Sequence, residues 1–206
     1  MSLIGLTGAH GTGKSTILRG VKAFGVPAFE SSLSRAAQTA LGWKDLKPAE
    51  ESEENMWALQ EQILASMYDR DTAVLESNTF TLVDRTPADV ASYVEVWKMK
   101  LERNGVKIDE EHAKDFRARC RAMAAKYTYH IIVPIDEAIP FEAEDHRASL
   151  DTRDYHEKAV CQFVISGGLN YIVLLHPDND IRVKRVTAMV NTLQHTKRSF
   201  GFSWGI

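Results

Sequence analysis

A lysine and a hydroxyl side chain follow a glycine-rich stretch near the start of the chain, in the sequence Gly8-Ala9-His10-Gly11-Thr12-Gly13-Lys14-Ser15. The spacing is G-x-x-x-x-G-K-[ST], in which glycines let the backbone approach a phosphate closely. Successive backbone N–H groups and the N-terminus of the following helix then face the anion. In this pattern the lysine reaches the β- and γ-phosphates, and the hydroxyl binds Mg²⁺. The motif therefore predicts a site for ATP and Mg²⁺ formed by Gly8, His10, Gly11, Thr12, Gly13, Lys14, Ser15 and Thr16.

The residues on both sides of the motif have the pattern that it needs. The apolar run at 3–6 predicts a buried strand, and apolar residues recur at helical spacing from Ile17 to Phe24. Further strands are predicted at 26–30, 80–83, 130–135 and 171–175. Helices are predicted at about 31–41, 56–70, 86–104, 110–126, 151–166 and 183–193. The polar stretches 43–54 and 137–150 are expected to be loops, and 194–206 has no assignment.

Strands that alternate with helices indicate an α/β fold, with a parallel sheet covered by helices on both faces. Ligands of such sheets bind beyond the carboxyl ends of the strands. Glu30, Asp84-Arg85 and the segment after Ile135 all follow predicted strands, so they share that edge with the glycine motif. The sequence thus predicts one P-loop NTPase domain over residues 1–206, with a small lid at about 137–155.

Composition excludes several classes of protein. Of 206 residues, 26% are charged and 44% hydrophobic, as is usual for a globular domain. A formal charge of −3 provides no overall positive field that would favour nucleic acid or a membrane surface. No apolar run is long enough to span a bilayer and no signal peptide precedes the first strand, so a cytoplasmic location is expected. Cys120 and Cys161 lack metal-ligand spacing and suit a reducing compartment.

The pair Asp84-Arg85 has the residue types that phosphate chemistry needs at the end of a buried strand. Asp84 is expected to organise Mg²⁺ or to bind the acceptor. Its alternative role is to cap the next helix, although Thr86 before Pro87 already fills that place. Arg85 is expected to grip the acceptor or a phosphate, with a surface salt bridge as the alternative.

Three segments make the chain resemble the P-loop kinases of nucleosides and nucleotides. They are GAHGTGKST, the strand-terminal Val83-Asp84-Arg85, and the arginine-bearing stretch from His146-Arg147 to Arg153. The nearest likeness is to the ribosylnicotinamide-kinase-like ATPase/kinase group and to phage-type nucleotide kinases, in which a helix with an Asp and a Tyr follows the Asp-Arg pair. Here that stretch reads DRTPADVASY. The resemblance implies a five-stranded sheet in the order 2-3-1-4-5 and a phosphotransferase.

The resemblance also implies roles for three more residues. Nucleoside kinases carry a general-base carboxylate where Glu30 stands, and a base helps a hydroxyl acceptor lose its proton. A phosphate acceptor needs no base, and a helix cap or a solvated turn residue is the alternative for Glu30. Arg147 and Arg153 are expected to close over phosphate oxygens with the lid, or else to pair with nearby aspartates as solvated loop charges.

Some residues have a less specific interpretation. His10 occupies a variable position of the glycine motif, where an exposed side chain is expected rather than a catalytic one. Trp57, Tyr93 and Trp97 are expected in the core, with stacking on an acceptor base as the alternative. Arg117, Arg119 and Arg121 crowd one face of the helix predicted at 110–126.

The function predicted first is an ATP-dependent kinase of a small nucleotide or nucleoside, with a deoxynucleoside monophosphate as the first choice of acceptor. A kinase of a hydroxymethylated base in DNA is an alternative that the low net charge disfavours. A P-loop ATPase that switches a protein partner is another alternative. No membrane partner is expected, and a homodimer stays open.

Overall fold

The computed structural model describes residues 3–30, 32–77, 79–137 and 150–200. Within these residues the chain forms one parallel sheet in the order β2-β3-β1-β4-β5, as predicted. The strands are β1 Leu3–Thr7, β2 Ala28–Phe29, β3 Thr81–Asp84, β4 Tyr127–Ile132 and β5 Tyr171–Val173. β1 lies in the centre, so the loop after it opens at the middle of the carboxyl edge.

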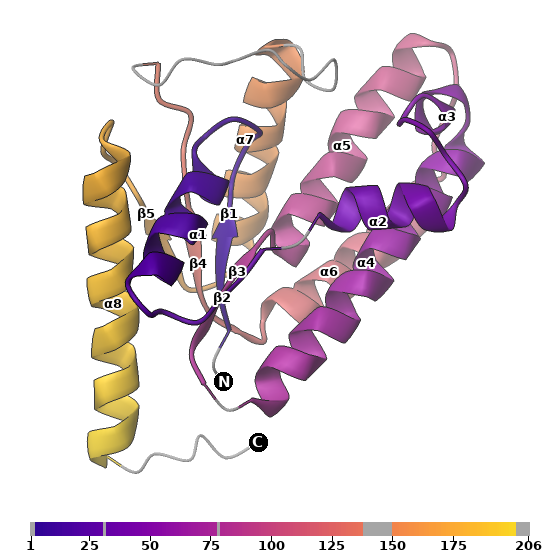
Figure 1. Ribbon diagram of the computed structural model, residues 1–206. Helices are drawn as coiled ribbons and strands as arrows, with labels where there is room; N and C mark the ends of the chain where they lie inside the picture. The colour runs from indigo at the N-terminus through magenta and orange to yellow at the C-terminus, as the bar shows by residue number, and fades with distance from the viewer. Residues whose placement is uncertain (1–2, 31, 78, 138–149, 201–206) are drawn as a thin grey trace.

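Helices cover both faces of this sheet (Figure 1). They are α1 Lys14–Ala23, α2 Leu33–Ala40, α3 Pro48–Glu51, α4 Glu53–Glu76, α5 Pro87–Arg103, α6 Glu110–Ala124, α7 Leu150–Ser166 and α8 Asn179–Phe200. α1 and α8 pack on one face, where Ile4 and Leu6 of β1 meet their apolar sides. The helices from α2 to α7 form a larger apolar core on the other side. None of the described helices is long and apolar enough to cross a membrane.

A glycine in α1 lets α8 come close to it. A Cβ atom built on Gly20 would lie 2.5 Å from a methyl group of Val183. Such a contact is far shorter than van der Waals distance, so only glycine permits this approach of the two helices. The result brings the N-terminal part of α8 beside the loop between β1 and α1.

Four of the predictions for individual elements are wrong in their bounds. The stretch 43–54 was expected to be a loop but contains α3 and the start of α4. Its glutamates stand in the first turns of these helices, where negative side chains are favourable, and Ser52 caps α4 by accepting from the Asn55 N–H. α4 continues to Glu76, and α8 extends to Phe200, well beyond 193. β4 begins and ends three residues earlier than predicted because Tyr127 and Tyr129 pair with β1.

Candidate active site

The loop between β1 and α1 takes the backbone course that its glycines predict. Gly8, Gly11 and Gly13 have φ angles of 139°, 72° and 90°, in the region that side chains disfavour. A Cβ atom on Gly8 would lie 2.3 Å from the Val133 carbonyl oxygen, so no larger residue fits there. Among the described residues no side chain caps α1 at Gly13. The N–H groups of its first turn are therefore available to an anion.

Lys14 is buried against the loop that precedes it. Its Nζ donates to the Gly8 carbonyl at 2.9 Å, to the Ala9 carbonyl and to Thr12 Oγ1 at 3.3 Å. Burial, together with the nearby Arg85 charge, lowers the pKa of Lys14 to about 7. An anionic ligand would compensate this burial, so the side chain is suited to bind phosphate oxygens.

Three arginines from distant parts of the chain bind the carbonyl side of the same loop. Arg85 donates to the Gly8 oxygen, Arg153 of α7 to the His10 oxygen, and Arg182 of α8 to the Thr12 oxygen, each at 3.0 Å. Each cation aligns a peptide dipole and adds positive potential near the phosphate position. Two of these arginines were predicted site residues, Arg85 at the strand end and Arg153 in the lid, and both contact the glycine loop itself.

Arg182 has no counterpart among the predicted site residues. Its side chain is 0% exposed, and it also forms an ion pair with Asp136 at 3.5 Å. The contact with Thr12 spans 170 residues of sequence, and no local pattern in α8 indicates it.

Asp84 is buried at the end of β3, beside β1 and its loop. Burial raises the pKa of its carboxyl group, while the Arg85 and Lys14 charges oppose that rise. Its Oδ1 has no hydrogen-bond partner among the described residues. Ser15 stands exposed at the start of α1. A carboxylate oxygen and a hydroxyl are hard ligands, so these two residues fit the Mg²⁺ that such a fold uses together with phosphate oxygens and water.

No described group of three or more His, Cys, Asp or Glu side chains could hold a metal ion alone.

Asp89 connects the glycine loop to α5. Its Oδ1 accepts from the Gly8 N–H at 3.1 Å and from Arg85 at 3.0 Å, and its Oδ2 accepts from the Thr86 N–H at 2.8 Å. Burial alone would raise the pKa of Asp89, but the Arg85 and Lys14 charges and the Thr86 hydrogen bond outweigh it and lower the pKa. Asp89 is the aspartate in the stretch DRTPADVASY, and its place in sequence alone does not indicate this role.

Arg70 of α4 holds the turn after β3 through hydrogen bonds to its backbone. Arg85 has a φ of 65°, which is unusual for a residue with a side chain. Arg70 donates to the carbonyl oxygens of Asp84 at 2.6 Å and Arg85 at 3.1 Å, and it is held by Asp71 and Tyr127. Arg70 therefore positions the pair at the strand end, a role that its place near a predicted helix end did not suggest.

Thr86 caps α5, with Asp89 completing the capping box. The alternative that Asp84 caps this helix is therefore wrong. Arg85 does form an ion pair, with Asp89, but the pair lies against the glycine loop rather than on an open surface.

The other predicted residues are placed as follows. Glu30 is exposed directly after β2, where Phe29 pairs with Val83, so its backbone lies at the same edge as that of Asp84. His10 is partly exposed, and Trp57 and Trp97 lie in the core as expected. Tyr93 is half-buried between Arg85 and the ring of His156. Arg147 and most of the predicted lid lie outside the described residues.

One protein family matches most of the chain. The sequence model of a family described as AAA domain matches residues 3–180. No curated protein sequence matches the chain.

Similar solved structures include a deoxyadenosine kinase from M. mycoides with products dCMP and a flexible dCDP bound. The TM-score is 0.64 at 14% identity, over 92% of this chain and 99% of that one. The NadR protein in complex with NR gives a TM-score of 0.67 at 14% identity, over 94% of this chain but 52% of the other. The YorR protein from Bacillus subtilis with phosphorylated GDP gives 0.50 at 15% identity, over 94% and 98%. These likenesses show a shared P-loop NTPase fold.

Proposed function

Because the chain belongs to the AAA domain family and carries a complete glycine-lysine-serine loop, we propose that it is an ATP- and Mg²⁺-dependent kinase of a small nucleotide or nucleoside. One observation carries the proposal. Lys14, the adjacent pair Asp84-Arg85 and Arg153 come from three separate parts of the chain, α1, the end of β3 and α7, yet all lie on or beside the same loop at the carboxyl edge of the sheet. Fold likeness to a deoxyadenosine kinase supports it.

The described residues supply what phosphoryl transfer requires. The charge of the transferring group spreads over its oxygens, so catalysis depends on positioning and on positive charge. Backbone N–H groups of the loop and Lys14 would bind the β- and γ-phosphates, and Ser15 and Asp84 would hold Mg²⁺, which neutralises charge on those phosphates when bound. An acceptor oxygen then bonds to the γ-phosphorus as the bond to the β–γ bridging oxygen breaks, which leaves ADP.

The acceptor that we propose first is a deoxynucleoside monophosphate. Its phosphate would approach from the side of Arg85, which follows Asp84 directly at the strand end and whose charge lowers the pKa of Asp84. One observation favours a nucleoside as a second candidate. Glu30 is an exposed carboxylate at the same edge as Asp84, where it could take the proton of a hydroxyl acceptor.

An acceptor screen tests this proposal. Deoxynucleosides, their monophosphates and oligonucleotides are each incubated with the protein, Mg²⁺ and ATP labelled in the γ-phosphate. We expect label in a deoxynucleoside diphosphate, and no label in any product of a Lys14→Ala variant. Hydrolysis of ATP that no acceptor stimulates would contradict the kinase proposal and favour an ATPase that acts on a partner protein.

The variant Glu30→Gln separates the two acceptor classes. A loss of kcat of about 10²-fold or more indicates that Glu30 is a general base and that the acceptor is a hydroxyl. A change of less than about twofold supports the monophosphate, which is already anionic. Glu76→Gln serves as the matched control, because Glu76 is an exposed glutamate at the end of α4.

A further inference from the structure

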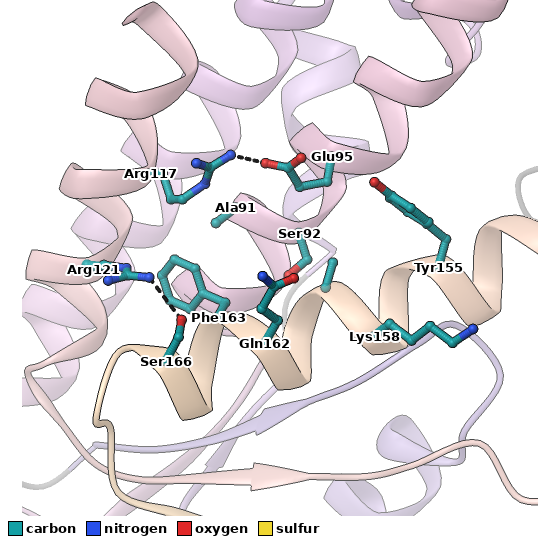
Figure 2. Close-up of a pocket in the computed structure, with 11 residues that line it drawn as sticks. Ala91, Ser92, Glu95, Arg117, Arg121, Tyr155, Lys158, Gln162, Phe163 and Ser166 are labelled. Atoms are coloured by element: carbon teal, nitrogen blue, oxygen red, sulfur yellow. Dashed lines mark hydrogen bonds and ion pairs between the residues drawn. The ribbon is translucent and has the colours of Figure 1, made fainter. Parts of the chain in front are cut away.

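A hollow in the molecule lies between α5, α6 and α7, with a volume of about 300 Å³ (Figure 2). Its lining includes Glu95 of α5, Arg117 and Arg121 of α6, and Tyr155, Lys158 and Gln162 of α7. None of the residues of the glycine loop, nor Asp84 or Glu30, lines it. Its volume is at the lower end of the range for small-molecule sites. This hollow, called the helix groove below, is therefore separate from the proposed active site.

The helix groove gathers positive charge in a chain that is negative overall. Three cations and one carboxylate line it, which gives +2, against a formal charge of −3 for the whole chain. Arg117 forms an ion pair with Glu95. Within the described part of the chain, neither Arg121 nor Lys158 is paired with a carboxylate. This balance suits a dianionic group such as a phosphate monoester.

The two arginines are spaced to act together. Arg117 and Arg121 are four residues apart on α6, so their side chains are neighbours on one face of the helix. Figure 2 shows both at the same end of the helix groove, with the Ser166 hydroxyl 3.1 Å from Nη2 of Arg121. Guanidinium groups bind phosphate oxygens through paired hydrogen bonds. This end therefore has the side chains of a phosphate site.

The opposite end has a different character. Tyr155 and Lys158 lie there (Figure 2), and Tyr155 is 38% exposed. Tyr155 and Ser166 are eleven residues apart on α7, so their Cα atoms are separated by about 16 Å along the helix axis. Gln162 lies between them, where its amide can both donate and accept hydrogen bonds. A ligand with a phosphate at one end and a flat polar ring at the other matches this order.

We propose that the helix groove binds a nucleoside monophosphate at a site distinct from the glycine loop. The phosphate lies between Arg117, Arg121 and Ser166, and the base lies against Tyr155 near Gln162. Glu95 repels the phosphate and competes with it for Arg117, so the carboxylate of this ion pair weakens binding.

Titration followed by nuclear magnetic resonance tests the proposal, with AMP as the probe. The Nε–Hε signals of Arg117 and Arg121 and the amide of Ser166 report on the helix groove, whereas the amides of Gly8, Gly11 and Gly13 report on the glycine loop. Each site is thus observed separately, whatever reaction the glycine loop supports. We expect saturable shifts of the groove signals. No saturable shift at about 10 mM AMP would overturn the proposal.

Two substitutions in the helix groove should change the affinity for AMP in opposite directions. Arg121→Gln should weaken AMP binding at the groove signals about 10-fold, whereas Glu95→Gln should strengthen it about threefold because a competing anion is removed. Arg119→Gln is the control for net charge, since Arg119 lies on the same helix but pairs with Glu61 and Asp115. Weaker binding in Glu95→Gln, or an equal loss in Arg119→Gln, would contradict a specific phosphate site.

Two further ligands test the nucleotide assignment. Adenosine lacks the phosphate and should leave the Arg117 and Arg121 signals unchanged. Inorganic phosphate lacks the base and should bind more weakly than AMP, without shifting the signals of Tyr155. Adenosine that binds as tightly as AMP, or phosphate that does so, would overturn the assignment to a nucleoside monophosphate.

Discussion

Within the described residues, the cations around the glycine loop bind main-chain carbonyl oxygens, which the cations of the helix groove do not. Around the loop, Arg85, Arg153 and Arg182 each donate to a main-chain carbonyl, and the side chain of Arg182 is 0% exposed. In the groove, Arg117 and Arg121 bind side-chain oxygens, and the side chain of Arg117 is 40% exposed. The first set is tied to the backbone, whereas the second is tied to other side chains.

This difference has energetic consequences. Charges that are buried interact strongly, because the surrounding dielectric is low and salt cannot screen them. Exposed pairs contribute about 0–1 kcal/mol each to stability. Changes at the glycine loop should therefore lower activity or the free energy of unfolding strongly, whereas equivalent changes in the helix groove should have small effects on both.

The largest effect is expected at Lys14. In the variant Lys14→Met, kcat/KM for ATP should fall about 10³-fold, because a charge that contacts the transferring phosphate is lost in a buried site. The circular dichroism spectrum should stay unchanged. Lys158→Met, in the exposed helix groove, should change kcat/KM by less than about twofold. An equal loss of kcat/KM in the two variants would contradict the difference between the glycine loop and the helix groove.

A slightly smaller effect is expected in folding when a buried carboxylate is neutralised. Asp89→Asn removes the negative charge that pairs with Arg85. An asparagine also has only one side-chain oxygen, so it cannot accept from the N–H groups of both Gly8 and Thr86 as the two carboxylate oxygens do. The free energy of unfolding should fall by about 3 kcal/mol. The groove counterpart Glu95→Gln should cost less than about 1 kcal/mol. Urea denaturation monitored by tryptophan fluorescence measures both, and equal losses would contradict the comparison.

A third prediction concerns the uptake of a proton when ATP binds. Burial lowers the pKa of Lys14 to about 7, and contact with a triphosphate favours the charged amine and so raises that pKa. Above pH 7 the binding of ATP should therefore take up a proton, and affinity should fall by up to about 10-fold per pH unit until the raised pKa is passed.

Calorimetry in buffers of different ionisation enthalpy measures this uptake directly. Lys14→Met should abolish it, while Lys158→Met should retain it. An ATP affinity that is the same at about pH 7 and about pH 9 would show that Lys14 does not change its protonation on binding.

Local pattern was enough to predict the centre of this molecule. The apolar run at 3–6, the glycine spacing from Gly8 to Ser15 and the cap at Thr86 each depend on neighbours in sequence, and the structure has each of them. The strand order, which the family resemblance implied, is also present. Polar helix starts are harder, since glutamates that stabilise a first turn look like a loop, as they did before α4.

What could not be predicted depends on contacts between distant residues. Arg70 reaches the end of β3 from α4, and Asp89 holds a loop that lies 81 residues earlier. Periodicity indicates which face of a helix is buried, but not which carbonyl a buried arginine will meet. The roles assigned to Glu30, Asp84, Arg85 and Arg153 stay predictions until the kinetic experiments are done.

The contact between Arg182 and Thr12 has a consequence for how the protein is made. Ribosomes deliver the glycine loop first, and the arginine that completes its carbonyl side arrives 170 residues later. A nascent chain, or a fragment cut ahead of α8, carries the whole phosphate motif in its sequence while lacking one of the clamps that shape it. The glycine loop therefore gains this contact only after the start of α8 has been made.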